Sequence, residues 1–358
     1  MSVGQLREIP VYFLKNYFNS VFRAKHSPGE FSRLKVALVS DALTQASLEV
    51  ECSVRNVTPE NFERVFRDWR PDVLFVESAW QGFRNSWKYC IASYPDHPKR
   101  TNLHLRRMLD AAEREGIPAV FWNKEDSVHY SRFIESARLF RYIYTVDGNC
   151  IEQYRADSPN AAIIGVLPFP VQPRFHHPEV KGKANPGYSC FIGSYGTHVH
   201  PRRRQWQDSL FEVFSAKGLD VYDRNSGRKS VHYRYPRLPG LTVRSRVPYE
   251  KTASLYKSYK FNLNVNTVES SPTMYSRRLI EILAVGGVAI TTPSLAASQL
   301  FSEYCHIVSS RGAMEEVIAW SASQYEIAQE RARHGSQLVL KNHTWAHRLQ
   351  ALEDSSIF

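Results

Sequence analysis

Short apolar runs alternate with amphipathic segments through the first half of the chain. Apolar runs predict strands at 34–40, 72–78, 117–126, 142–147 and 161–169. Apolar positions at helical spacing predict helices at 58–71, 102–116 and 131–140 and a short helix at 149–156. The run LKVALVS (34–40) is apolar on both faces, which is typical of a strand buried in a parallel sheet. Strands and helices alternating at this spacing predict a doubly wound parallel sheet.

A proline-rich stretch at 168–187 interrupts the alternation and predicts a linker between two domains. The pattern then restarts. Further strands are predicted at 188–194, 219–224, 260–266 and 288–292. The helices predicted in this half lie at 202–218, 250–259, 275–285 and 315–354. Between them, the stretch at 225–247 is basic and shows no regular pattern.

These elements predict an α/β protein in which two Rossmann-like doubly wound domains face each other across a cleft. The predicted parts are an N-terminal amphipathic segment (1–30), a first domain (31–170), a linker (171–187), a second domain (188–335) and a C-terminal helix that returns to the first domain (336–358). The aromatic, mildly basic helix expected at 9–24 could pack on the protein body or lie on a membrane surface. Ligands of open parallel sheets bind beyond the carboxyl ends of the strands, so we expect the site in the cleft.

The charge balance limits the classes of binding partner that we expect. The chain carries 46 Lys+Arg against 35 Asp+Glu, a formal net charge of +11, which favours anionic partners. The cations are spread along the chain, are densest at 202–204 and 224–246, and form no long tail. We therefore expect a phosphorylated small molecule or an anionic membrane face as the partner, and no nucleic acid.

Cysteines and hydropathy indicate the compartment. The five cysteines are far apart and include no C-x-x-C pair, so neither a zinc knuckle nor a disulfide framework is expected. No apolar run approaches the roughly 18 residues of a membrane span, and the N-terminus lacks a signal-peptide core. These features predict a cytoplasmic protein, at most peripherally associated with the inner face of the membrane.

A turn and the start of a helix in the second half could bind phosphate. After the strand at 188–194, Gly193 and Ser194 form a small turn whose backbone N–H groups and hydroxyl can approach a phosphate, although such turns are also common structural devices. Arg202, Arg203 and Arg204 then open a helix, where cations oppose the helix dipole. They face either an anion or solvent.

The stretch SRRLIEILAVGGVAITT (276–292) places charges in an apolar helix. Arg278 and Glu281 are three residues apart and so share a helical face, either as an ordinary surface pair or as groups directed into the cleft. A glutamate there can accept two ribose hydroxyls, and an arginine can neutralise a diphosphate. Gly286 and Gly287 end the helix and let the next strand start close by.

In their order along the chain, these stretches resemble the GT-B glycosyltransferases, and more narrowly the CgeB-like (YkvP/CgeB, spore-protein-like) family. The likeness covers about residues 34–352. The stretches that carry it are YSCFIGS, VPYEKTASLYKSYKFNLNVN and SRRLIEILAVGGVAITT in the second half, LFVESAWQG, FWNKEDSVHY and YIYTVDGNCIEQYR in the first, and NHTWAHRLQAL near the end. Many GT-B enzymes have two glutamates eight positions apart, but Thr273 stands eight before Glu281, and the nearest upstream acid is Glu269.

The resemblance implies a donor site in which Arg278 contacts the diphosphate and Glu281 holds the ribose. The donor-binding residues that we predict are Gly193, Ser194, Arg203, Arg278, Glu281, Gly286 and Gly287. It also implies metal independence, because basic residues and a helix dipole can neutralise the leaving diphosphate. His198 and His200 lack the third ligand that a metal site would need.

An inverting transfer also needs a carboxylate that takes the acceptor proton. The acids at strand ends of the first half are Asp41, Glu77, Glu125 and Asp126, and we predict Asp41 and Glu77 as catalytic. An aspartate at a strand end is also a routine cap, and a retaining enzyme would need no such base.

We therefore expect a cofactor-free enzyme that moves a hexose-like sugar from a nucleoside-diphosphate sugar to a cell-surface glycan precursor or a protein. Three roles remain open for the basic 225–247 stretch. It could bind a lipid-linked or anionic acceptor, dock on a membrane, or be a solvated insertion. Two alternatives remain for the function: an epimerase of nucleotide sugars with the same fold, and a non-catalytic nucleotide- or glycan-binding protein.

Overall fold

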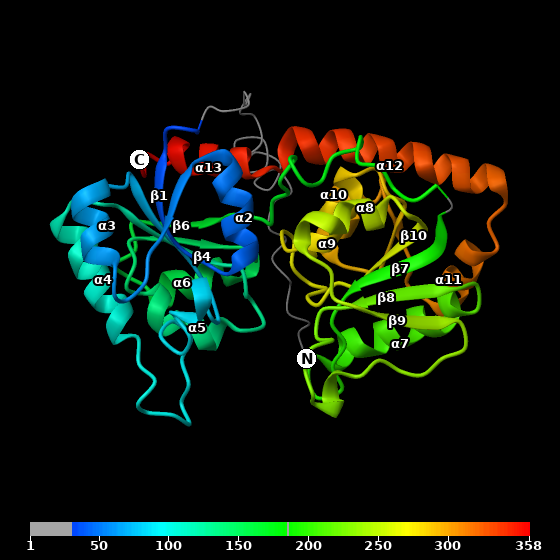
Figure 1. The fold of residues 1–358 in the computed structure, drawn as a ribbon, viewed down its shortest axis with the longest axis horizontal. Coiled ribbons are helices and arrows are strands. Elements are labelled where there is room, and N and C mark those ends of the chain that lie inside the picture. The colour runs from blue at the N-terminus through cyan, green and yellow to red at the C-terminus, as the bar shows by residue number, and fades with distance from the viewer. Residues whose placement is uncertain (1–30, 185) are drawn as a thin grey trace, which may run out of the picture.

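Two parallel six-stranded sheets, one in each lobe of the molecule, organise the chain (Figure 1). The computed structural model describes residues 31–184 and 186–358. The predicted amphipathic segment at 1–30 thus lies outside the described residues. Two doubly wound parallel domains were predicted, and two are found.

The first sheet has the strand order β2-β1-β3-β4-β5-β6. Its strands are β1 (Lys35–Val39), β2 (Ser53–Asn56), β3 (Val73–Glu77), β4 (Ala119–Asn123), β5 (Tyr142–Thr145) and β6 (Ile163–Val166). Its helices are α2 (Ala42–Glu51), α3 (Phe62–Trp69), α4 (Leu103–Arg114), α5 (Tyr130–Ala137), α6 (Ile151–Asp157) and α13 (Trp345–Asp354). Successive side chains of a strand face opposite sides, so Leu38 packs in the cluster of Trp345 from α13, and Val39 in that of Phe66 from α3.

The second sheet has the order β12-β11-β10-β7-β8-β9. Its strands are β7 (Gly187–Gly193), β8 (Leu219–Asp223), β9 (Leu241–Ser245), β10 (Tyr259–Asn264), β11 (Ala289–Thr291) and β12 (His306–Ile307). Its helices are α7 (Pro201–Ser215), α8 (Thr252–Tyr256), α9 (Arg277–Ala284), α10 (Leu295–Phe301), α11 (Arg311–Ile318) and α12 (Ala322–Asn342). Ile192 of β7 packs with Ile280 of α9, whereas the neighbouring Phe191 packs with Phe211 of α7.

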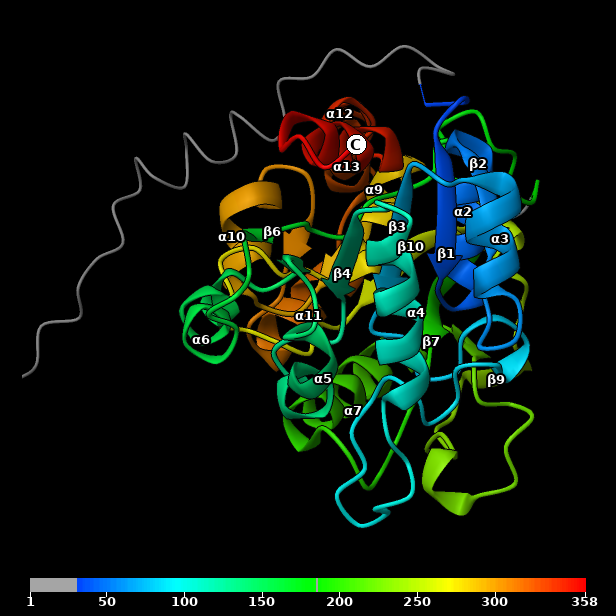
Figure 2. The same ribbon diagram turned by 90° about the vertical axis from the view of Figure 1, so that its left-hand side faces the viewer.

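The strand order reverses at one point in each sheet, between β1 and β3 and between β7 and β10. At such a point the helices leave toward opposite faces, which opens a crevice beyond the carboxyl ends of the two strands. Figure 2 shows β1 and β3 in the first lobe with β10 and β7 of the second lobe behind them. We therefore expect the functional site among the residues just after β1, β3, β7 and β10.

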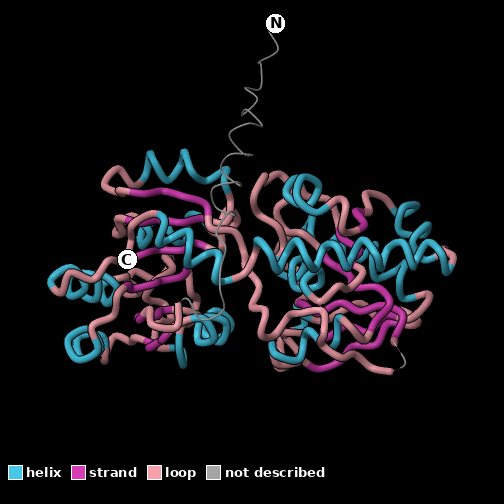
Figure 3. Tube along the Cα trace, turned by 90° about the horizontal axis from the view of Figure 1, so that it is seen from above, coloured by secondary structure: helices cyan, strands magenta, loops and turns pink. Residues whose placement is uncertain are grey.

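The C-terminal region spans both lobes (Figure 3). The single helix predicted at 315–354 is wrong, because α11, α12 and α13 replace it. The side chain of Ser321 accepts from the backbone of Gln324 in a capping box that starts α12, and Thr344 caps α13. α12 contributes Val339 to the core of the second lobe, and α13 packs on the first. At the crossing, Val171 pairs with Thr344, so the two passages between the lobes lie side by side.

Several elements were not predicted: α2, β2, β9, α10 and β12. The edge strands β2 and β9 are largely open to solvent and lack the buried apolar run that identified the central strands. β9 lies within the basic stretch that was expected to be irregular. α3 starts at Phe62 with Asn61 at its N-cap, so the predicted start at Thr58 is wrong. None of the helices at 31–184 and 186–358 has the length and apolarity of a membrane span.

Candidate functional site

A cavity of about 510 Å³ lies between the lobes, where the strand order of the second sheet reverses. From the first lobe it is lined by Asp41, Leu43, Trp80, Lys124, Glu125 and Phe169. From the second lobe the charged and aromatic lining residues are Arg203, Arg224, Tyr249, Tyr256, Tyr275, Arg277, Arg278 and Glu281. The predicted site in the cleft therefore exists as a space with both lobes in its wall.

Arg278 lies across the carboxyl ends of β7 and β10. Its Nε donates to the carbonyl oxygen of Ile192 at 2.5 Å, and its Nη1 donates to Oδ1 of Asn264 at 3.3 Å. The guanidinium also lies 4.5 Å from the ring centroid of Phe191. These contacts fix a positive charge in the cavity wall, where Arg278 was predicted to act.

Glu281 also lines the cavity, and its ion-pair partner is Arg277. Its Oε1 lies 3.0 Å from Nε of Arg277, one turn earlier, rather than beside Arg278. This contact is an ion pair without directed hydrogen-bond geometry. The hydroxyl of Tyr256 donates to Oε2 at 3.3 Å. Of the two readings left open for Arg278 and Glu281, the ion pair is not found, because Arg278 turns toward the strand ends and leaves the carboxylate to Arg277; both side chains line the cavity.

Two further arginines complete a positive wall. Nη2 of Arg203 donates weakly to the carbonyl oxygen of Ser194 at 3.4 Å. Burial and the nearby Arg278 and Arg224 lower the pKa of Arg203 to about 10, so it stays charged at neutral pH. Within residues 31–184 and 186–358, neither Arg203 nor Arg224 forms an ion pair with a carboxylate. Guanidinium groups that repel one another in this way are stabilised by a bound anion.

The predicted glycines divide into two groups. A Cβ at Gly193 would lie 2.7 Å from Nη2 of Arg278 and 2.7 Å from the buried ring of Phe191, so the bare backbone permits the position of Arg278. Gly286 (φ +68°) and Gly287 end α9 at its far end and do not line the cavity. Their position favours a structural role over donor binding. Ser194 lines a second, neighbouring cavity.

We predict that Gly193→Ala weakens nucleotide binding by about tenfold and costs about 1–3 kcal/mol of stability through overpacking. The guanidinium of Arg278 would give way before the buried Phe191 ring does. Titration calorimetry with nucleoside diphosphates measures the loss. The control is Gly312→Ala, where an added Cβ meets only Oγ of Ser310 at 3.8 Å. Unchanged affinity in Gly193→Ala would show that the position of Arg278 does not matter for binding.

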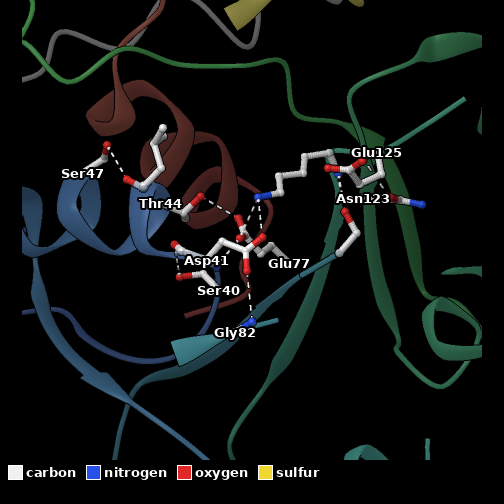
Figure 4. A network of polar contacts seen from close by, with 11 residues as sticks. Ser40, Asp41, Thr44, Ser47, Glu77, Gly82, Asn123 and Glu125 are labelled. Carbon is white, nitrogen blue, oxygen red and sulfur yellow. Dashed lines mark hydrogen bonds and ion pairs between the residues drawn. The ribbon is translucent and has the colours of Figure 1, made fainter. Parts of the chain in front are cut away.

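The two predicted catalytic carboxylates have different environments (Figure 4). Glu77 is fully buried at the end of β3; its Oε2 accepts from the hydroxyl of Thr44 at 2.6 Å, and its Oε1 accepts from the backbone N–H of Asp41 at 2.5 Å. Asp41 lines the cavity with a side chain that is 31% exposed. Only Asp41 can reach an acceptor, and the geometry favours a positioning role for Glu77.

Asp41 is not used as a helix cap, although it occupies the N-cap position of α2. Its Oδ1 accepts from the backbone N–H of Gly82 at 3.0 Å, and its Oδ2 lies 3.5 Å from Nζ of Lys124. Lys124 also lies 2.8 Å from Oε1 of Glu77. Burial disfavours the ammonium, but Glu77 and Asp41 outweigh it and raise the pKa of Lys124 above its usual value. This lysine therefore holds both carboxylates in place.

The other two candidate acids also differ in their environment: one lines the cavity and the other is buried. Glu125 lines the cavity. Asp126 is fully buried and accepts from Thr145 at 2.7 Å and Tyr154 at 2.8 Å. Burial raises the pKa of Asp126 to about 7, and the group faces the interior of the first lobe. Asp126 is thereby a structural residue of this lobe.

Sequence reasoning missed Lys124, Arg277 and Trp80. Lys124 directly follows β4, in the polar end of a strand that was recognised, and its position after a parallel strand was the available signal. Arg277 lies in the stretch that was singled out, but Arg278 was predicted to act with Glu281 in its place. Nothing in the sequence distinguishes Trp80 from a core tryptophan.

The position eight before Glu281 lies at the junction of the lobes. Thr273 is buried, its Oγ1 donates to the carbonyl oxygen of Val146 at 2.9 Å, and it accepts from the N–H of Gly148 at 2.7 Å. Glu269 pairs with Arg202 instead. Neither Thr273 nor Glu269 lines the cavity. In the described part of the chain, no three His, Cys, Asp or Glu side chains converge as metal ligands.

Residues 202–354 match a family model described as glycosyl transferase-like. HepE of Anabaena, solved in complex with UDP, is similar in structure with a TM-score of 0.55, 11% identity and coverage of 92% of this chain and 93% of that one. Sucrose-phosphate synthase of Thermosynechococcus elongatus matches with a TM-score of 0.51, 12% identity and coverage of 83% and 76%.

The UDP-forming α,α-trehalose-phosphate synthase of Burkholderia vietnamiensis has a TM-score of 0.50, 10% identity and coverage of 88% and 77%. No curated protein matches the sequence. Likeness at this level of identity establishes the fold, and the predicted GT-B fold is confirmed.

Proposed function

We propose that the protein is a glycosyltransferase that binds a nucleoside-diphosphate sugar between its lobes and transfers the sugar to an acceptor hydroxyl. The observation that carries this proposal is the wall formed by Arg203, Arg224 and Arg278 beside Glu281, at the strand reversal of the second sheet. The match to the glycosyl transferase-like model supports it, because residues 202–354 include all four of these residues. The resemblance in sequence leads us to the CgeB-like family.

Charge and hydrogen-bonding capacity indicate which residue binds each part of the donor. Arg203 and Arg278 bind the diphosphate, and the Glu281 carboxylate accepts hydrogen bonds from the ribose hydroxyls. Val247 and Tyr249 line the same cavity as Glu281 and leave an apolar surface for the base. The positive wall takes up the charge that develops on the leaving diphosphate, which is consistent with metal-independent transfer.

In the transfer step the acceptor oxygen forms a bond to the anomeric carbon as the bond from that carbon to the diphosphate breaks. The diphosphate leaves with both electrons of that bond, and Asp41 takes the acceptor proton in an inverting reaction. We assign the acceptor to cell-surface glycan precursors or proteins at the cytoplasmic side of the membrane.

We predict that one nucleoside diphosphate raises the unfolding temperature of the wild type and that Glu281→Ala removes this shift. A ligand at 100 times its Kd adds about 2.7 kcal/mol, which corresponds to several degrees. The measurement is thermal unfolding with ADP, GDP, UDP, CDP and dTDP and their sugars. Glu269→Ala is the matched control, because this acid pairs with Arg202 outside the cavity.

Glu281→Ala also leaves Arg277 without its carboxylate, so the ligand-induced shift is the readout rather than the unfolding temperature itself. Glu281→Gln keeps a hydrogen-bond acceptor and should bind with intermediate affinity. A panel that shifts nothing in the wild type, or an equal shift in Glu281→Ala, would contradict the donor site.

A non-catalytic nucleotide-binding protein is the second candidate, favoured by Thr273 where many GT-B enzymes have a glutamate. Turnover distinguishes the two. Release of nucleoside diphosphate from a bound nucleotide sugar supports the transferase, and binding without turnover supports the second candidate. Interconversion of two nucleotide sugars without an acceptor would instead identify an epimerase.

A further inference from the structure

A second cavity, of about 840 Å³, adjoins the first. The two share Trp80, Arg203 and Arg224 in their walls. The residues that line only the second are His129, Ser194, Tyr195, Gly196, Val199, His200, Asn225, Gly227, Arg228, Tyr233 and Arg246. The basic stretch at 225–247, whose role the sequence left open, contributes Asn225, Gly227, Arg228, Tyr233 and Arg246 to this wall.

The second cavity has a cationic wall. Arg203, Arg224, Arg228 and Arg246 line it, and none of its lining residues is an aspartate or a glutamate. By contrast, the neighbouring Arg244 points elsewhere and pairs with Asp220 at 3.0 Å. No such partner is found for Arg228 or Arg246 among the residues that the structure describes.

Two aromatic contacts give the cavity a defined shape. The Arg228 guanidinium lies 4.6 Å from the ring centroid of Tyr233, which orients it as a flat donor surface. On the opposite lobe, Trp80 meets His129 edge to face with ring centroids 5.1 Å apart. Burial, Arg203 and His129 lower the pKa of His200, in keeping with an excess of positive charge. An aromatic wall facing guanidinium groups suits a sugar that carries an anion.

We propose that the second cavity binds the acceptor and that this acceptor carries a phosphate group, held by Arg228 and Arg246. This inference rests on the proposed function, since the donor phosphates are assigned to Arg203 and Arg278 in the first cavity. Guanidinium forks match phosphate oxygens in pairs, which favours phosphate over a neutral glycan. Trp80 lines both cavities, so a sugar packed on it lies between the phosphate and Asp41, the proton acceptor of the first cavity.

The test is titration calorimetry with glucose 6-phosphate and with glucose, in the presence of saturating UDP. The proteins are the wild type, the double variant Arg228→Gln/Arg246→Gln and the control Arg237→Gln, which removes a charge from the same stretch outside the cavity. We expect glucose 6-phosphate to bind about tenfold or more weakly to the double variant and within twofold of the wild type to the control. Glucose should not distinguish the three.

Equal affinity of the wild type and the double variant for glucose 6-phosphate, or no binding to the wild type, would overturn the proposal. So would displacement of glucose 6-phosphate by UDP, because the second cavity would then belong to the donor. UDP binding that depends on Glu281 is measured separately, so the donor site can stand when the acceptor site fails. If none of ADP, GDP, UDP, CDP and dTDP binds, the proposed function has failed first; if another of them binds in place of UDP, the calorimetry is done with that nucleotide.

Flotation with phosphatidylcholine vesicles, with and without undecaprenyl phosphate, separates two sources of the phosphate. Binding that requires undecaprenyl phosphate and is lost in Arg228→Gln/Arg246→Gln supports a lipid-linked acceptor. Binding of glucose 6-phosphate with no vesicle binding supports a soluble phosphosugar. Vesicle binding that the double variant retains would contradict the assignment of the phosphate to Arg228 and Arg246.

Discussion

Asp41→Asn is expected to lower kcat by about 10²- to 10⁴-fold, the range typical of a lost general base, while nucleotide binding stays within twofold. Asparagine has nearly the same shape and keeps the oxygen that accepts from the N–H of Gly82. It cannot take a proton from the acceptor hydroxyl. Folding should be preserved, because the contact of Glu77 to residue 41 is made with its backbone N–H.

Glu125→Gln is the matched control, since Glu125 is the other first-lobe carboxylate in the cavity wall. A larger loss in Glu125→Gln than in Asp41→Asn would move the base to Glu125. The anomeric configuration of the product completes the test. A retained configuration with nearly full activity in Asp41→Asn would contradict the role of Asp41, because retaining transfer needs no such base.

Lys124→Met should destabilise the protein by about 3–5 kcal/mol, the cost of breaking a buried ion pair. Methionine fills a similar volume but leaves the fully buried Glu77 carboxylate without its cation. The loss is measured by thermal and denaturant unfolding. It should shrink as the pH falls, because protonation of Glu77, whose pKa rises further without Lys124, removes the uncompensated charge.

The double variant Lys124→Met/Glu77→Gln is predicted to recover most of that stability, since no buried charge remains. It should still lose activity, because Asp41 no longer has the ammonium that positions its carboxylate. Stability of Lys124→Met equal to that of the wild type would show that the network does not support the first lobe. Full activity of the double variant would remove the positioning role.

The fold could be predicted because its signals are local. Runs such as 34–40 and 72–78 are apolar on both faces, and only a strand covered by helices on both sides buries them. Edge strands carry no such signal, since β9 exposes most of its side chains and lies in the basic 225–247 stretch, for which a solvated insertion was one of the roles left open. The break between α12 and α13 depends on the cap at Thr344 and on packing against the other lobe, which helical periodicity does not report.

The sequence predicted which residues lie at the site, but only some of the side chains that they contact. Arg278, Glu281 and Asp41 were expected at the cleft, and all three line the cavity. The partner of Glu281 could not be predicted, because residues three and four apart share a helical face equally, and the β7 backbone decides which arginine turns away. Whether a carboxylate such as Glu77 ends buried or open depends on contacts from distant segments, here Lys124.

The central claim is that Arg203, Arg278 and Glu281 form a nucleoside-diphosphate site. Its most direct test is a crystal structure with the diphosphate that gives the largest thermal shift. We predict both phosphates within hydrogen-bond distance of the Arg203 and Arg278 guanidinium groups, and the ribose hydroxyls against the Glu281 carboxylate. A nucleotide bound on another surface, with the cavity between the lobes empty, would contradict the claim.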